Sequence, residues 1–267
     1  MSILQPRLSP RQSDIVRLAR TSGRVDVDSL ASQFQVTPQT IRKDLNELCE
    51  HGVLERYHGG AMVKSGVANL AYESRREMAP DAKHRIGALA ASLIPDDCSI
   101  LINIGTTTEQ VAMALRERRG LMVITNNINV AHILQASPGI EVVVAGGVLR
   151  HADGGIVGEA AVEFIRQFRV DYAVVGASAI DLDGSLLDFD YREVSVTKAI
   201  LAGARKSILV ADSMKFARSA PVRIGHLSAL DCFVTDEPPP SSIRAVCQEN
   251  DVTIETTSAA SPRALAN

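Results

Sequence analysis

The stretch that decides the fold class lies at residues 99–115 and reads SILINIGTTTEQVAMAL. Its first four residues include two isoleucines and a leucine, which are typical of a buried strand. After Gly105, the residues Val111, Ala112 and Leu115 have the spacing of one helix face. A strand that leads directly into a helix is the repeating unit of parallel α/β sheets, so this stretch predicts such a sheet.

The same alternation of strand and helix extends over most of the chain. Further β-branched runs occur at residues 121–125, 140–145, 170–176, 207–211, 232–235 and 252–254, with helix-like segments between them. This pattern predicts an α/β domain built on a mostly parallel sheet, with helices on both faces.

A glycine and three threonines stand at the first strand-to-helix turn, as Gly105, Thr106, Thr107 and Thr108. Backbone N–H groups, hydroxyl donors and the positive end of the helix dipole all favour an anion there. This turn therefore predicts phosphate as the ligand. The alternative is that one threonine caps the helix and the others fill loop positions.

Other strand ends carry polar or glycine residues that we expect at the same edge of the sheet, because ligands of parallel sheets bind beyond the carboxyl ends of the strands. The alternative for each of them is an ordinary turn or surface role. The candidate effector-binding residues outside the threonine turn are Asn126, Asn127, Gly147, Gly176, Glu193, Asp212 and Lys215.

The first 64 residues have the pattern of a winged helix-turn-helix. Apolar spacing predicts helices at about residues 10–21, after Asp26 as a cap, and after the cap Thr37 with Pro38 at the first helical position. Residues 53–63 alternate apolar and polar side chains around Gly59 and Gly60, as a two-stranded wing would. The candidate DNA-binding residues are Thr37, Gln39, Thr40, Arg42, Lys43, Arg56 and His58. The alternative is a helical oligomerisation or lid domain with a solvated basic face.

Charge and composition support two domains. The chain has 267 residues, 46% of them hydrophobic, and a net charge of -3. Residues 1–64 hold nine Lys/Arg and seven Asp/Glu, so the excess of basic residues lies in the N-terminal part of the chain. We expect a DNA-binding domain at 1–64, a linker at 65–82, an effector-binding domain at 83–256 and a disordered tail at 257–267.

Several classes of protein are disfavoured by the sequence. The four cysteines form no C-x-x-C pair or cysteine–histidine cluster, so we expect neither a metal site nor a disulfide framework. No apolar run approaches the roughly 18 residues of a membrane helix, and the first residues have no signal-peptide core. We therefore expect a cytoplasmic protein without a cofactor.

Two runs in the first domain, VTPQTIRKDL at residues 36–45 and RYHGGA at residues 56–61, resemble the DNA-binding domain of DeoR-type bacterial transcriptional regulators. The second domain is similar to the sensor domain of that family in the runs at residues 126–131, 153–159, 183–191 and 235–240. The chain departs from the family pattern at Asn103, where aspartate is usual, and at Met214, which interrupts an Asp-x-Ser-Lys-Phe pattern.

The resemblance implies a sensor fold like that of ribose-5-phosphate isomerase and a repressor released from its operator by a phosphorylated metabolite. It favours glycerol 3-phosphate as that metabolite and a tetramer as the assembly. Two alternatives remain open on the residues themselves. One is a sugar-phosphate isomerase with an accessory helical domain, in which Glu193 or Asp188 acts as a base. The other is a repressor that answers another sugar phosphate, such as a ribose or fructose phosphate.

Overall fold

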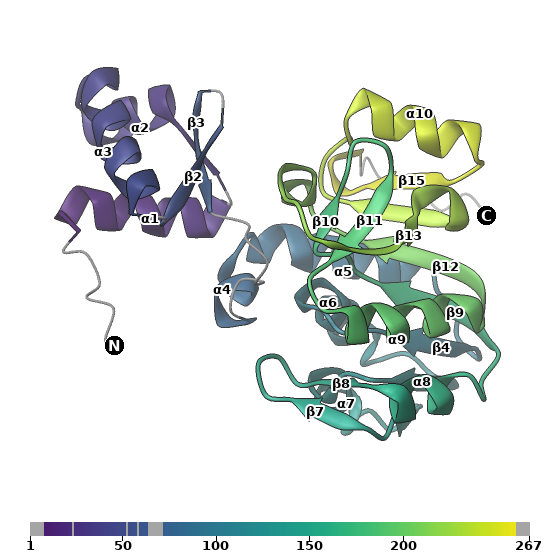
Figure 1. Cartoon of the computed structure of the whole chain (residues 1–267). Helices are drawn as coiled ribbons and strands as arrows, with labels where there is room; N and C mark the ends of the chain where they lie inside the picture. The colour runs from purple at the N-terminus through teal and green to yellow at the C-terminus, as the bar shows by residue number, and fades with distance from the viewer. Residues whose placement is uncertain (1–7, 23, 52, 58, 64–71, 260–267) are drawn as a thin grey trace. The chain divides into compact units, whose positions relative to one another are not determined.

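The computed structural model describes residues 8–22, 24–51, 53–57, 59–63 and 72–259. Backbone contacts divide the chain into two compact units, residues 1–79 and 80–267 (Figure 1). Each unit has its own hydrophobic core.

The first unit is a helical domain with a small antiparallel sheet. Its core is formed by residues such as Ile15, Leu30, Ile41, Leu45 and Leu48, which confirms the apolar stripe read from the sequence. The helices are α1 (Pro10–Ser22), α2 (Val27–Phe34) and α3 (Pro38–Glu50), and the strands pair in the order β1 (Arg24–Asp26), β3 (Gly60–Val63), β2 (Leu54–Tyr57).

Local chemistry explains the start of α3. The Thr37 hydroxyl accepts a hydrogen bond from the Thr40 backbone N–H at 3.3 Å, so Thr37 is the expected cap. Gln35 ends α2 in the left-handed region at φ 53°, where glycine is the usual residue. The expected cap at Asp26 is wrong, because its carboxylate accepts a hydrogen bond from the Tyr57 hydroxyl and makes none with α2.

The wing has one strand more than the sequence predicted. Val25 is buried and pairs with Ala61, so Arg24–Asp26 forms a third strand. The close approach of this strand requires glycine at residue 60, since a Cβ there would lie 2.1 Å from the Val25 carbonyl oxygen. The turn of the hairpin includes Gly59, and Gly60 belongs to the strand that follows.

The expected linker at 65–82 contains regular structure in its described part. Tyr72–Glu77 forms α4, and the next helix already begins at Pro80. No residue of α4 is buried, which explains why the sequence showed no apolar periodicity there.

The second unit is built on a seven-stranded sheet in which all strands are parallel. This confirms the predicted fold class, and the predicted runs at residues 99–102, 121–125 and 232–235 are strands with those bounds. The strand order is β15 (Thr253–Thr256), β14 (Cys232–Thr235), β12 (Ala204–Val210), β9 (Val170–Val175), β4 (Ser99–Ile102), β5 (Leu121–Thr125), β6 (Ile140–Val144).

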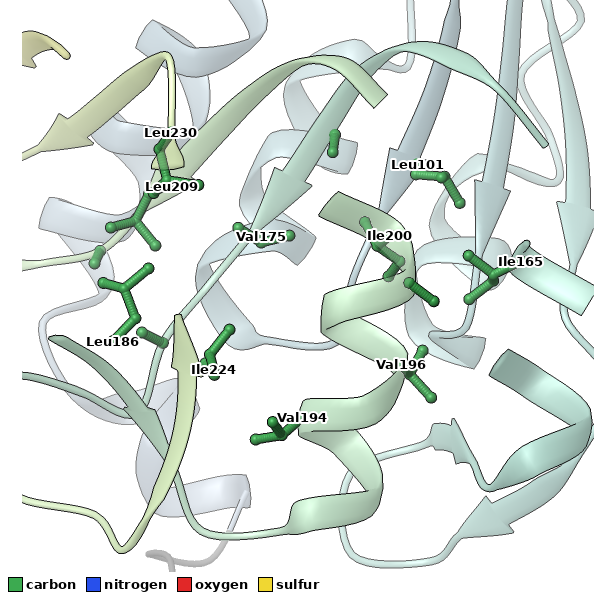
Figure 2. Close-up of a cluster of buried hydrophobic side chains, with 14 of the residues drawn as sticks. Leu101, Ile165, Val175, Leu186, Val194, Val196, Ile200, Leu209, Ile224 and Leu230 are labelled. Carbon is green, nitrogen blue, oxygen red and sulfur yellow. The ribbon is translucent and has the colours of Figure 1, made fainter. Parts of the chain in front are cut away.

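Helices cover both faces of this sheet. Ile100 and Ile102 belong to one buried cluster and Leu101 to the other, as expected for the alternating side chains of a strand. Figure 2 shows the second cluster, in which Ile200 and other side chains of its helices lie among those of the strands. The first face is covered by α5 (Pro80–Ser92), α6 (Thr106–Leu115) and α7 (Ile128–Leu134), and the second by α8 (Glu159–Ile165), α9 (Tyr191–Ala202) and α10 (Ser241–Glu249).

The sequence missed five short strands that lie outside the main sheet. Three of them have only two or three residues, too few to show a clear alternation. One pair is β7 (Val148–Arg150) with β8 (Gly155–Val157), and the other group is β10 (Ala179–Ile180), β11 (Ser185–Asp188) and β13 (Val222–His226). Single-turn helices occur as η1 (Ser213–Ala217), η2 (Leu227–Ala229) and η3 (Thr257–Ala259). The start of the expected disordered tail is therefore ordered, and residues 260–267 lie outside the described residues.

The close packing of α5 against α6 depends on Gly87. A Cβ at this position would lie 2.5 Å from the backbone carbon of Gln110. We expect Gly87→Ala to lower the free energy of unfolding of the second unit by about 1–3 kcal/mol, because the helices must separate. Urea unfolding of the full chain measures this. Gly225→Ala is the matched control, since nothing lies within 4 Å of a Cβ there, and an equal loss in both variants would contradict the packing argument.

Candidate functional site

The first candidate site is the surface of α3 with the start of α1. Gln39, Arg42 and Lys43 are exposed on the first half of α3, as the sequence predicted. Together with Arg11 and Asn46 they line a groove of about 1240 Å³. Thr37 and Thr40 lie at the start of the helix, where their hydroxyls are 2.9 Å apart and bond to each other.

The wing contributes one described basic residue to the first site. Arg56 on β2 is exposed, and its Nη1 donates a hydrogen bond to the Gly60 carbonyl at 3.3 Å. That bond holds the guanidinium close to the tip of the hairpin. The other predicted wing residue, His58, lies outside the described residues.

The second candidate site begins at the turn between β4 and α6. Gly105 has φ 149°, a conformation that other residues rarely adopt, and it offers no side chain to cap α6. The N–H groups of the first helical turn therefore remain available to an anion. The Thr106 and Thr107 side chains are nearly buried, at 8% and 6% exposure. Thr108 differs, because its hydroxyl bonds to the carbonyl oxygens of Asn103 and Gly105 and fixes the turn.

A lysine that the sequence did not single out lies at the same edge of the sheet. Lys83, on the first turn of α5, is only 3% exposed. Helix α5 leads into β4 and α6 leads out of it on the same face, so both helices run against the strand direction. Both therefore begin at the carboxyl edge of β4. A buried ammonium group beside an uncapped helix start adds positive charge to this edge.

Asn103 stands at the end of β4, where the family pattern has aspartate. Its Nδ2 donates to the Thr197 hydroxyl at 2.8 Å, and that hydroxyl donates to the Glu193 carbonyl at 2.9 Å. A carboxylate has no proton to donate, so asparagine suits this contact. The Asn103 Oδ1 is buried and has no hydrogen-bond partner among the described residues.

Gly176 and Asp212 lie at the ends of the neighbouring strands β9 and β12. A Cβ on Gly176 would be 4.0 Å from the Thr108 methyl and 3.8 Å from the Val210 carbonyl oxygen, so the threonine turn and the end of β12 are close. Asp212 is fully buried. Its Oδ1 accepts from the Met214 N–H at 3.2 Å, while its Oδ2 has no partner within the described part of the chain. Lys215 follows in the same turn, its N–H bonded to the Asp212 carbonyl at 3.1 Å.

Three other predicted residues make contacts within the domain, and their role toward the effector stays a prediction. Asn126 donates to the Ile156 carbonyl at 3.1 Å and so joins β5 to β8. Asn127 caps α7 through the Asn129 N–H at 2.9 Å. Gly147 is required by packing, since a Cβ there would lie 2.9 Å from the Ile156 side chain. These contacts hold the β7–β8 hairpin against the edge that carries the threonine turn.

The predicted residue Glu193 belongs to an ion-pair cluster around Arg150, which the sequence analysis missed. Arg150 on β7 donates to Asp153 at 2.7 and 2.8 Å, to Asp190 at 3.0 Å and to Glu193 at 2.5 Å. Its side chain is only 18% exposed. Asp188 stands nearby and accepts a hydrogen bond from the Ser178 hydroxyl at 2.9 Å. The cluster thus ties the β7–β8 hairpin to the start of α9.

The pKa values of two carboxylates in this cluster are shifted in opposite directions. Burial, with the charge of Asp188 as the next cause, raises the pKa of Glu193 to about 7. The hydrogen bond from Arg192, with further bonds from the Arg192 N–H and Arg150, lowers the pKa of Asp190 to about 2. Asp190 therefore stays ionised at neutral pH while Glu193 exchanges a proton there.

Two family models match the chain. The DeoR-like helix-turn-helix domain matches residues 11–66, and the DeoR C terminal sensor domain matches residues 78–237. The chain belongs to the DeoR family. It is a DNA-binding transcriptional repressor with a sugar-phosphate sensor domain, and it is not an enzyme. This assignment decides against the isomerase alternative.

Several relatives of this DeoR-family repressor cover nearly its whole length. The glycerol-3-phosphate regulon repressor of Escherichia coli is 43% identical over 92% of this chain and 97% of that protein. The protein of the same name from Haemophilus influenzae is 46% identical over 86% and 90%. The repressor CsqR of Escherichia coli is 40% identical over 95% and 97%.

The solved structures that resemble the repressor include ribose-5-phosphate isomerase A from Neisseria gonorrhoeae. It has 15% sequence identity and a TM-score of 0.37, and the match covers 51% of this chain and 53% of that one. In the described residues, no helix is long and apolar enough to cross a membrane.

The structure brings the predicted sensor residues together only in part. Thr106, Thr107, Gly176, Asp212 and Lys215 lie at or just after the ends of β4, β9 and β12, whereas the Glu193 side chain bonds to Arg150. Helix α9 is tied to this edge by the bond from Asn103 to Thr197. The sequence missed Lys83, Arg150 and Thr197. A lysine in an otherwise apolar helix face was a usable signal for Lys83, whereas no local signal marks Arg150 or Thr197.

The raised pKa of Glu193 predicts a pH dependence of stability. The folded sensor takes up a proton at a higher pH than the unfolded chain, so the contribution of Glu193 to stability falls as pH rises from about 4.5 to about 7. We expect Glu193→Gln to flatten this slope by up to about 1 kcal/mol per pH unit. Urea unfolding between pH 5 and 8 measures the effect. Glu163→Gln, at an exposed ion pair with Arg166, is the control, and an unchanged slope in Glu193→Gln would contradict the assignment.

Proposed function

We propose that this DeoR-family repressor binds glycerol 3-phosphate at the carboxyl edge of its sensor sheet and is thereby released from its operator. The observation that carries the proposal is the start of α6, where Gly105 provides no side-chain cap and Thr106 and Thr107 are nearly buried. Similarity to two glycerol-3-phosphate regulon repressors over most of the chain supports the choice of effector. We expect the protein to act in the cytoplasm, where operator DNA is found.

The phosphate group suits the threonine turn. The N–H groups of the first turn of α6 and the hydroxyls of Thr106 and Thr107 donate hydrogen bonds to an anion. Lys83 from α5 and Lys215 from η1 add positive charge at the same edge. Helix dipole and ammonium charges together favour a group with two negative charges.

The rest of the ligand must supply hydrogen-bond donors. Asn103 Oδ1 and Asp212 Oδ2 are buried acceptors without partners among the described residues. Leaving such atoms unpaired costs about 1–3 kcal/mol each, so a ligand that donates to them gains affinity. The hydroxyl groups of glycerol 3-phosphate are such donors. Other sugar phosphates share this chemistry, and the 40% identity to CsqR keeps another signal as the second candidate.

Release from DNA requires that the effector bind one sensor conformation better than the other. A ligand with equal affinity for both states shifts nothing. The β7–β8 hairpin and α9 meet at Arg150, and a Cβ on Gly155 of the hairpin would lie 2.4 Å from the side chain of Ile104, which precedes the threonine turn. We propose that closure of these elements around the ligand supplies the differential contacts.

Effector binding is tested by calorimetry with glycerol 3-phosphate, glycerol and fructose 6-phosphate. We expect the first to bind and unphosphorylated glycerol to bind far more weakly. Thr107→Val removes one hydroxyl at nearly constant volume and is expected to weaken binding roughly ten- to hundredfold, since bonds to charged groups are the stronger ones. Thr253→Val on β15 is the matched control.

Two outcomes bear on the proposal in different ways. Tight binding of glycerol, or unaltered affinity in Thr107→Val combined with Lys215→Ala, contradicts the phosphate site. Preference for fructose 6-phosphate leaves the mechanism in place and replaces the signal.

Operator binding is proposed to use one face of the first unit. The residues are Thr37, Gln39, Thr40, Arg42, Lys43, Arg56 and His58, with the first half of α3 in the major groove. The exposure of Gln39, Arg42 and Lys43 on that half supports this role. Thr37 and Thr40 bond to each other, and because each hydroxyl has one proton, the hydroxyl that accepts this bond keeps its own proton for a phosphate oxygen.

A single reading head gives limited discrimination, so we propose a symmetric homo-oligomer that binds half-sites separated by whole helical turns. Two observations on the sensor domain support it as the assembly surface. Strand β6 is the edge of the sheet, pairing only with β5 among the described strands. Val144 on β6 and the neighbouring Ile128, with Val148 and Leu149 on β7, are between 38% and 64% exposed. Exposed apolar edges of this kind are usually covered.

We expect Val144→Lys to shift the protein to a smaller species in sedimentation velocity, because a charge on the edge strand opposes strand pairing. Family resemblance favours a tetramer as the wild-type state. Leu182→Lys is the control, since Leu182 is 58% exposed but lies on the loop between β10 and β11. A monomeric wild type at micromolar concentration with full operator binding would count against the proposal.

A further inference from the structure

Arg11 on the first turn of α1 is fixed to the recognition helix by an ion pair. Its Nε donates to Asp44 Oδ2 on α3 at 2.6 Å. The Asp44 side chain is 8% exposed, whereas that of Arg11 is 36% exposed. The aspartate is therefore the buried partner, and the guanidinium extends from it toward solvent.

A second contact beside this pair makes the junction rigid. Gln12 Nε2 donates to Glu47 Oε2 on α3 at 2.6 Å. Gln12 also exchanges hydrogen bonds with Ser9, 2.9 Å from the Ser9 N–H and 3.1 Å to the Ser9 hydroxyl, which caps α1. The first turn of α1 thus has a defined position on α3.

The outer edge of the Arg11 guanidinium is open. In the part of the chain that the structure describes, its two Nη atoms make no hydrogen bond. Arg11 lines the same groove as Gln39, Arg42, Lys43 and Asn46 of α3. A planar guanidinium that is held at Nε still presents two parallel N–H groups, which match the oxygens of a phosphate.

We propose that Arg11 is a DNA-backbone contact, in which Asp44 holds Nε and both Nη groups bind one phosphate of the operator. The contact comes from α1, outside the recognition helix and the wing. It positions α3 on the duplex and reads no base, because phosphates carry no sequence information. It also explains an acidic residue on the helix that enters DNA, since Asp44 orients a cation there.

A purely structural role for Arg11 makes a different prediction. If Arg11 only neutralises Asp44, removing both charges together leaves DNA binding as it was. If Arg11 binds a phosphate, the double variant Arg11→Ala with Asp44→Asn stays weak although the net charge of the chain is unchanged. The double variant therefore separates the two roles.

The experiment uses the full-length protein and a duplex selected by it from a random library, with a scrambled duplex for comparison. We expect the double variant to bind both duplexes about fivefold more weakly at 0.15 M salt and to lower the salt slope by about one. We expect Asp44→Asn alone to weaken binding, although the removed negative charge by itself would strengthen it. That loss should vanish when Arg11 is already alanine.

Two further variants serve as references. Arg17→Ala removes a charge of α1 that pairs with Asp14 and does not line the groove, so it should leave the salt slope unchanged. Arg42→Ala should reduce the preference for the selected duplex about five- to hundredfold, as the loss of a base contact does. Thermal unfolding of each variant checks that the first unit is folded. Wild-type affinity and salt slope in the folded double variant would overturn the proposal.

Discussion

The parallel pairing of β4 with β9 is the constraint on which the sensor domain depends. Ile100, Leu101 and Ile102 pair with Tyr172, Ala173 and Val174 at the centre of the sheet. From β4 the chain builds β5 and β6 on one side, and from β9 it continues to β12, β14 and β15 on the other. The connections therefore leave this pair toward opposite faces. Ligands of open parallel sheets bind beyond the strand ends at such a point, and the threonine turn and Gly176 lie at these two ends.

The ion-pair cluster around Arg150 is partly buried, and its role is to fix neighbouring elements relative to one another. Arg150 is shared by three carboxylates from the β7–β8 hairpin and α9. Breaking such a cluster by removing one partner strongly destabilises a protein, whereas the intact cluster contributes little net stability. The cluster therefore acts mainly by positioning the elements that it joins. It fixes the hairpin against α9. Because the pKa of Glu193 is raised to about 7, the charge at this link changes with pH near neutrality.

The DNA-binding unit uses the same principle on a smaller scale. Helix α3 is defined at its start by the Thr37 cap and on its flank by the contacts of Arg11 and Gln12 from α1. The wing is held by the Tyr57 hydroxyl, which donates to Asp26. Polar contacts between elements thus fix the orientation of a core whose apolar packing alone tolerates small shifts.

The sequence by itself determined the α/β class, the bounds of strands such as β5 and β14, the Thr37 cap and the strand-to-helix turn at Gly105. These features follow from period and capping, which act between residues close in the chain. Only the tertiary structure decided that Asn126 bonds to the backbone of β8, that Asp26 accepts a hydrogen bond from Tyr57, and that Arg150 pairs with Glu193, which is 43 residues away. The physical reason is that a polar side chain takes whichever partner folding brings to it, and no local pattern names a partner so distant in sequence.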